Sequence, residues 1–141
     1  MKRLWAVTVC VLLVSVTGGA FGHHHKRRKG ADPEICALKT VYVRGNSESA
    51  DIARREIAQR TWLGVADDPQ KADAVLDLSE RTTEKDFPIR TMRTTVSGEL
   101  KKGSKLLWSD SAWFDEGVFN SGAGSAVKIL LSRLNKAANC H

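Results

Sequence analysis

The body of this 141-residue chain contains almost no histidine. Its four histidines are His23, His24, His25 and His141, all near the ends of the chain. Histidine is the usual general base near neutral pH and a frequent metal ligand. The sequence therefore argues against Ser-His hydrolases, Cys-His enzymes and histidine-zinc catalysis, and it leaves open a hydrolase that uses carboxylates or a Ser-Lys pair.

Long apolar runs are also absent. The apolar stretch of residues 4–16 is shorter than the roughly twenty residues that a membrane-crossing helix needs. It follows two basic residues and precedes the small residues 17–20, which is the order of a secretory signal peptide. We expect residues 1–22 to be that signal and the protein to be periplasmic or secreted. A retained anchor, or lipid attachment at Cys10, is the alternative.

The body has no excess of charge of either sign. The chain carries +6 overall, but residues 31–141 contain sixteen basic and sixteen acidic side chains. The excess lies in the signal and in a basic, histidine-rich arm, residues 23–33, which we expect to be flexible. Its cations could hold anionic envelope polymer or lipid headgroups through charge alone. They are Lys26, Arg27, Arg28 and Lys29.

The same arm has the composition of a copper or nickel site. Cleavage after Ala20 or after Gly22 would place a histidine third in the new chain. A free amine, two amide nitrogens and that imidazole form the square-planar set that Cu(II) and Ni(II) prefer. The sequence thus offers His23, His24 and His25 as metal ligands, and a solvated tail is the alternative interpretation.

Cysteine is scarce, with three residues in the chain. Cys10 would leave with the signal, so Cys36 and Cys140 remain in the exported protein. An oxidising compartment favours their pairing, and we predict one disulfide. Two buried free thiols are the alternative. If the bond forms, no cysteine is left for nucleophilic catalysis or for zinc.

Alternating and helical apolar patterns divide the rest of the chain. Strands are predicted at 38–43, 63–66, 72–81, 92–101 and 105–114, and amphipathic helices at 48–61 and from 121 onward. This order predicts a single α+β domain over residues 34–141. We expect two layers, with a mainly antiparallel sheet of about five strands and two helices on one face.

Three short segments, residues 40–43, 68–76 and 105–109, resemble motifs of small bacterial envelope modules. Such modules occur in curli-secretion and lipopolysaccharide-assembly lipoproteins. The resemblance implies an envelope location and a binding or assembly role, and it implies no catalytic residue. The partner would be an envelope protein or an anionic envelope polymer.

The last predicted strand carries apolar residues on both faces. Leu107 and Trp113 fall opposite the residues that we assign to the core. On an open sheet face they would form a partner surface. Alternatively, a loop near Phe87 covers that face, or a bulge turns Trp113 inward.

Paired carboxylates could supply acid-base or calcium chemistry, although solvated charge is the simpler interpretation. The pairs are residues 67–68, Asp73 with Asp77, and residues 115–116. A glycine-containing segment, residues 122–125, could bind an anion at a helix start or could allow close helix packing. The sequence as a whole indicates an exported envelope protein that acts by binding or assembly, without inferred catalysis.

Overall fold

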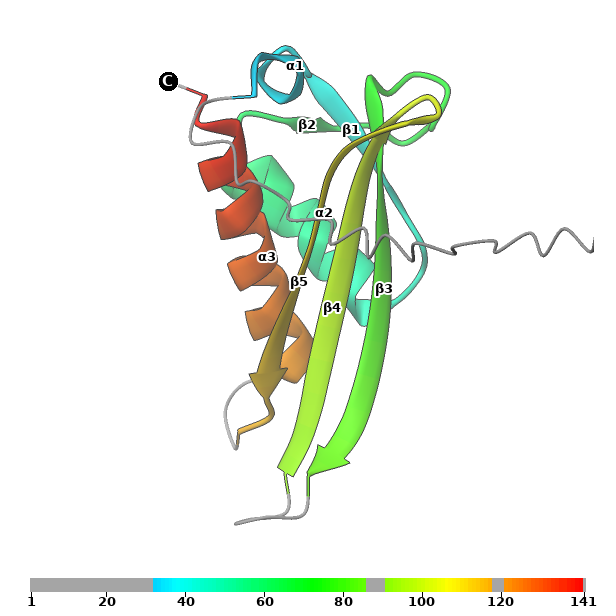
Figure 1. Cartoon of the computed structure of the whole chain (residues 1–141). Coiled ribbons are helices and arrows are strands. Elements are labelled where there is room, and N and C mark those ends of the chain that lie inside the picture. Colours follow the sequence, from blue (N-terminus) through cyan, green and yellow to red (C-terminus); the bar gives the residue numbers. More distant parts are fainter. Residues whose placement is uncertain (1–31, 86–90, 118–120, 141) are drawn as a thin grey trace, which may run out of the picture.

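The computed structural model describes residues 32–85, 91–117 and 121–140 of the chain. These residues form five strands and three helices (Figure 1). In chain order these elements are α1 (Pro33–Cys36), β1 (Thr40–Arg44), α2 (Glu48–Arg60), β2 (Gly64–Val65), β3 (Ala74–Lys85), β4 (Thr91–Lys102), β5 (Lys105–Asp115) and α3 (Gly122–Ala138).

The strands form one mixed sheet in the order β2-β1-β3-β4-β5. β1 is parallel to both β2 and β3, whereas β3, β4 and β5 form an antiparallel meander. The parallel pairings are short, and the antiparallel ones run nearly the whole length of β4. The predicted α+β fold with a mainly antiparallel sheet of five strands is confirmed.

Side-chain caps set the starts of the two long helices. Ser47 accepts a hydrogen bond from the Ala50 amide at the start of α2, and Ser121 accepts one from the Gly124 amide at the start of α3. Both serines have extended backbone, as N-cap residues normally do. α3 ends at Ala138, and the next residue, Asn139, caps it in the left-handed conformation typical of a helix terminus.

The core lies between the sheet and the pair α2 and α3, which cover the same face (Figure 1). Alternate residues of β1, β3 and β4 are buried on that face, as the pleat of a strand requires. The apolar residues that recur at helical spacing in α3 are all buried: Val127, Leu130, Leu131, Leu134 and Ala138.

The two ends of the domain are joined covalently. Cys36 in α1 and Cys140 just after α3 form a disulfide with 5.4 Å between their Cα atoms, as the cysteine count predicts. Asp32 accepts a hydrogen bond from the Glu34 amide and caps α1, so helical structure begins within the segment assigned to the arm. Among the helices that the structure describes, none has the length and apolar character needed to cross a membrane.

The β3–β4 hairpin is longer than the sequence pattern indicates. The pattern predicts a strand ending at Arg81 and a polar loop after it, but β3 continues to Lys85 and pairs there with Thr91. Residues 79–85 are exposed, so neither face of this stretch has to be apolar. The usual alternation is therefore missing from a segment that is nonetheless a strand.

Candidate functional site

The sheet face opposite α2 and α3 is covered by neither of these helices, and we call it the open face (Figure 1). Cross-strand partners lie on the same face, so the register identifies its residues. It is polar and charged over most of its area, with many serines and threonines. On the antiparallel strands it comprises residues 75, 77, 79, 81, 83 and 85 of β3, odd positions 91–101 of β4, and residues 106, 109, 111, 113 and 115 of β5.

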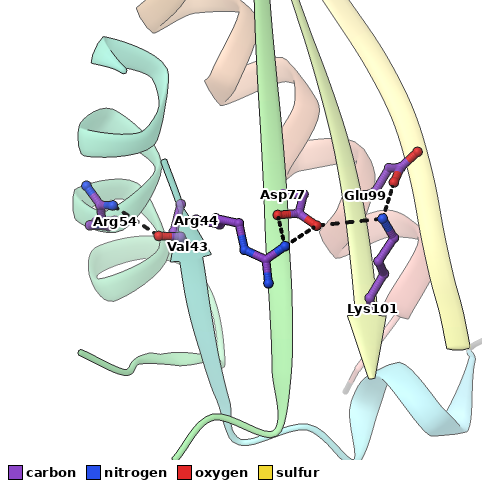
Figure 2. Close-up of polar contacts among 6 residues, drawn as sticks. All are labelled: Val43, Arg44, Arg54, Asp77, Glu99 and Lys101. Atoms are coloured by element: carbon purple, nitrogen blue, oxygen red, sulfur yellow. Dashed lines mark hydrogen bonds and ion pairs between the residues drawn. The ribbon is translucent and has the colours of Figure 1, made fainter. Parts of the chain in front are cut away.

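A chain of ion pairs crosses this face from β1 through β3 to β4 (Figure 2). Arg44 of β1 lies 3.1 Å from Asp77 of β3, and Asp77 lies 3.6 Å from Lys101 of β4. Lys101 also contacts Glu99 at 2.5 Å, and this contact is the main reason that its pKa is raised. The four charges balance, so Asp77 serves to tie strands together.

Asp73, the other carboxylate of the predicted acid pair, fastens the start of β1 to the start of β3. Its Oδ2 accepts hydrogen bonds from the Lys39 amide at 2.8 Å and the Thr40 amide at 3.0 Å. The Thr40 hydroxyl accepts in turn from the Asp73 amide at 3.1 Å. The hydrogen bond from the Lys39 amide is the main cause that lowers the Asp73 pKa below its usual 3.8.

Replacing Asp73 with Asn should lower the free energy of unfolding at neutral pH. Because the folded-state pKa of Asp73 is depressed, its carboxylate stabilises the fold above the unfolded-state value, and this effect is lost as pH falls through the folded-state value. The stability difference between wild type and Asp73→Asn should therefore shrink below pH 3.8. Urea titrations across that range measure it. Asp67→Asn, at an exposed turn position, is the control, and a difference independent of pH would contradict the assignment.

The other predicted carboxylate pairs are also engaged in local structure. Asp68 accepts from the Gln70 amide at 2.8 Å within a turn. Asp115 binds Arg93 through two hydrogen bonds, which chiefly lower the Asp115 pKa. Among the described residues, no cluster of three acidic, histidine or cysteine side chains is placed to hold a metal ion.

The glycine-containing start of α3 is a close packing contact. A Cβ atom on Gly122 would lie 2.9 Å from the Thr94 hydroxyl of β4. The Gly124 amide, which an anion would need, donates to Ser121 at 3.1 Å instead. These contacts favour the interpretation that the glycines bring α3 close to the sheet.

A hollow of about 410 Å³ opens where α2 and α3 end. Asp73 and Asp77 do not line it, and its lining contains no carboxylate, so it offers no acid-base pair. The basic residues at its rim lie in the last turns of the helices, where cations compensate the helix dipole. The lining residues are Arg60, Thr61, Trp62, Ser132, Asn135, Lys136, Asn139 and Cys140.

Trp113 is the most exposed large apolar side chain among the described residues. It lies in β5 on the open face with 54% of its surface exposed. The Arg93 guanidinium stacks over its ring at 3.7 Å from the centroid, while Asp115 holds the same guanidinium at 2.6 Å. The sequence did not decide whether Trp113 points outward or inward. It points outward, so its indole and the Arg93 guanidinium lie side by side on the open face.

The prediction that Leu107 lies beside Trp113 on this face is wrong. Leu106 is the exposed residue, at 51%, and Leu107 packs against the core. The cause is a β-bulge: Leu100 pairs with Trp108, whereas Lys101 pairs with Leu106. Leu107 is thus the extra residue of the bulge, and the alternation before it is shifted by one position.

The remaining predicted sites lie outside the described residues. These are the histidines offered as Cu(II) or Ni(II) ligands, the four basic residues of the arm, and the signal peptide. For the metal site and the polymer-binding arm, the sequence-based prediction stands as it was made.

No protein-family model matches the chain, and a search of curated proteins finds no match. Its fold is similar to that of the PelC dodecamer from Paraburkholderia phytofirmans, with 18% identity over 70% of this chain and 90% of that chain and a TM-score of 0.54. A minor lipoprotein from Acinetobacter baumannii is 12% identical, over 72% and 94% of the two chains, with a TM-score of 0.44.

A lipoprotein from Neisseria meningitidis is 15% identical over 72% of this chain and 99% of that chain, with a TM-score of 0.44. Both of these structures are named as lipoproteins, the class of protein to which the sequence motifs are similar. At these identities the similarity concerns the fold.

Proposed function

We propose that this chain is an exported protein of the bacterial cell envelope that acts by binding a protein partner through the open face. The observation that carries the proposal is Trp113, more than half exposed on the open face and stacked with Arg93. Exposed Trp and Arg side chains are characteristic of residues that dominate protein interfaces. The PelC protein of similar fold is a dodecamer, which supports an assembly role.

The binding role is testable by photo-crosslinking in cells that export the full chain. A crosslinking amino acid in place of Ser111, an exposed residue of the open face two positions from Trp113, should yield a discrete adduct, because the partner would cover this position while Trp113 is kept. The same amino acid in place of Gln59, an exposed residue of α2, is the control and should yield none. Equal labelling at both positions, or none at position 111, would count against the open face.

Trp113→Ala should abolish the complex while leaving the domain folded. The exposed indole contributes little to the core, and its contact with Arg93 is worth about 0.5–1 kcal/mol at an exposed site. We therefore expect a change of at most about 1 kcal/mol in the free energy of unfolding. Met92→Ala removes an exposed apolar side chain from the opposite face of the sheet and should leave binding intact. Urea denaturation and recovery of the complex test the pair of variants.

A further inference from the structure

Basic side chains are unevenly distributed over the open face. They gather around Trp113, where β3, β4 and β5 lie side by side. Arg81 and Trp113 flank the same residue of β4, Thr95, so the two side chains stand in one row across the sheet. The group has three basic residues and one acidic residue, and we call it the basic end of the open face. It comprises Arg81, Lys85, Arg93, Trp113 and Asp115.

The basic end keeps an excess of positive charge after its own ion pair is counted. Arg93 is held by Asp115 at 2.6 Å, so these two charges balance. Arg81 and Lys85 are exposed, and among the described residues neither forms an ion pair. The hydrogen bonds from Arg93 chiefly lower the pKa of Asp115, and the charge of Lys85 is a smaller cause of the same shift. Two positive charges therefore remain beside the indole of Trp113.

The carboxylates of the same hairpin do not lie on this surface. Glu80 lies on the helix side of β3, where it accepts a hydrogen bond from the Ser49 hydroxyl of α2 at 2.6 Å. Glu84 lies on the same side, because residues four positions apart on a strand share a face. A partner that contacts the open face thus meets Arg81 and Lys85 and not these acids.

The opposite end of the open face has no such excess. There Asp77 lies between Arg44 and Lys101, and Lys101 also contacts Glu99 (Figure 2). A charged partner at that end would have to compete with these existing ion pairs. The two exposed cations at the basic end can form ion pairs without giving up others, so a carboxylate gains most beside Trp113.

We infer that the partner is a different protein, whose acidic contact surface surrounds an apolar site for the Trp113 indole. This inference rests on the proposed binding role of the open face. Protein interfaces commonly bury an aromatic side chain at the centre and place charged groups at a polar rim, where opposite charges give specificity. Arg81 and Lys85 would form that rim on the side of β3.

Two other occupants fit these observations less well. A second copy of this chain has no acidic excess to offer, because residues 31–141 contain equal numbers of acidic and basic side chains and residues 23–30 are basic. An anionic polymer would match the cations, but its charge does not require an exposed indole. The indole and the two unpaired cations together favour a protein that presents both apolar and acidic groups.

Charge reversal tests this inference in cells that export the full chain with the crosslinking amino acid at Ser111. Arg81→Glu with Lys85→Glu should lower the yield of the adduct at least about tenfold, because like charges would then face each other. Arg81→Lys with Lys85→Arg keeps both charges and should preserve the yield. Arg55→Glu with Lys71→Glu is the matched control, because both residues are exposed outside the open face and the net charge changes equally.

Immunoblots of the exported chain correct each yield for the amount of protein, and circular dichroism of the purified variants confirms folding. If the double reversal does not fold, Arg81→Glu alone takes its place, with Arg55→Glu as its control. Digestion and mass spectrometry of the wild-type adduct identify the crosslinked segment of the partner. This segment should contain more acidic than basic residues.

An unchanged yield in the folded reversed variant would overturn the acidic partner, while the binding role of the open face would stand. A partner segment without an acidic excess, or an adduct with a second copy of this chain, would have the same consequence. An adduct whose added mass resists proteases would indicate an anionic polymer and would overturn both proposals. Both would also be overturned if the wild-type chain forms no adduct at position 111.

Discussion

Replacing Cys36 and Cys140 with alanine is expected to lower the free energy of unfolding by about 2–5 kcal/mol. The disulfide joins residues 104 positions apart, so it restricts nearly the whole unfolded domain. In the chain-entropy model a loop of about this length contributes about 4–5 kcal/mol, an upper figure. A domain of this size has a total stability of about 5–15 kcal/mol, so the bond is a large share of it.

Urea denaturation of the oxidised protein and the double alanine variant measures this difference. If the bond acts on the unfolded chain, the variant should also unfold with a larger dependence on urea, because its denatured state exposes more surface. Reduced wild-type protein should match the variant, which separates loss of the bond from loss of the cysteine side chains. A loss below about 1 kcal/mol would contradict the prediction.

The sequence was most informative where one physical constraint acted alone. Cys36 and Cys140 were the only partners for each other once the signal was set aside, and the structure joins them. Leu130 and Leu134 recur at helical spacing because a single face of α3 meets the sheet, and both are fully buried. In such cases the local sequence pattern is enough to predict the contact.

The sequence failed where the pattern depended on neighbouring strands. Residues 82–85, the last part of β3, were predicted as a loop because exposure on both sides removes the apolar alternation. Leu106 and Leu107 were exchanged because a bulge is a property of two paired strands, and the chain offers no glycine at that position to mark it. Neither feature is visible in one segment taken by itself.

The predicted carboxylate pairs also show that a site cannot be predicted from one segment when neighbouring strands determine its contacts. Asp73 and Asp77 were grouped as an acid pair from their spacing, but each is bound to a group from a strand distant in sequence. Their roles follow from the parallel pairing of β1 with β3, which sets Arg44 opposite Asp77. A one-strand pattern can place two acids on a strand and cannot identify what faces them.

Leu130→Ala is expected to lower the free energy of unfolding by about 2–5 kcal/mol, because it opens a cavity in a fully buried position. Gly98→Val should also destabilise, by about 1–3 kcal/mol, through overpacking. Gly98 lies in β4 beneath α3, and a Cβ atom there would lie 3.0 Å from Leu130 Cδ2 and 3.2 Å from Leu78 Cδ2. The absence of a side chain at this position is what lets α3 approach the sheet.

The double variant Leu130→Ala with Gly98→Val should be more stable than the sum of the two losses predicts. The valine would occupy space that the shortened side chain vacates, and coupling between contacting residues amounts to about 0.5–3 kcal/mol. Leu134→Ala, one turn further along α3 and equally buried, is the control and should add to Gly98→Val without such compensation. Urea denaturation of the five variants and the wild type gives both cycles. If the Leu130 cycle is additive, Gly98 does not set the distance between α3 and the sheet.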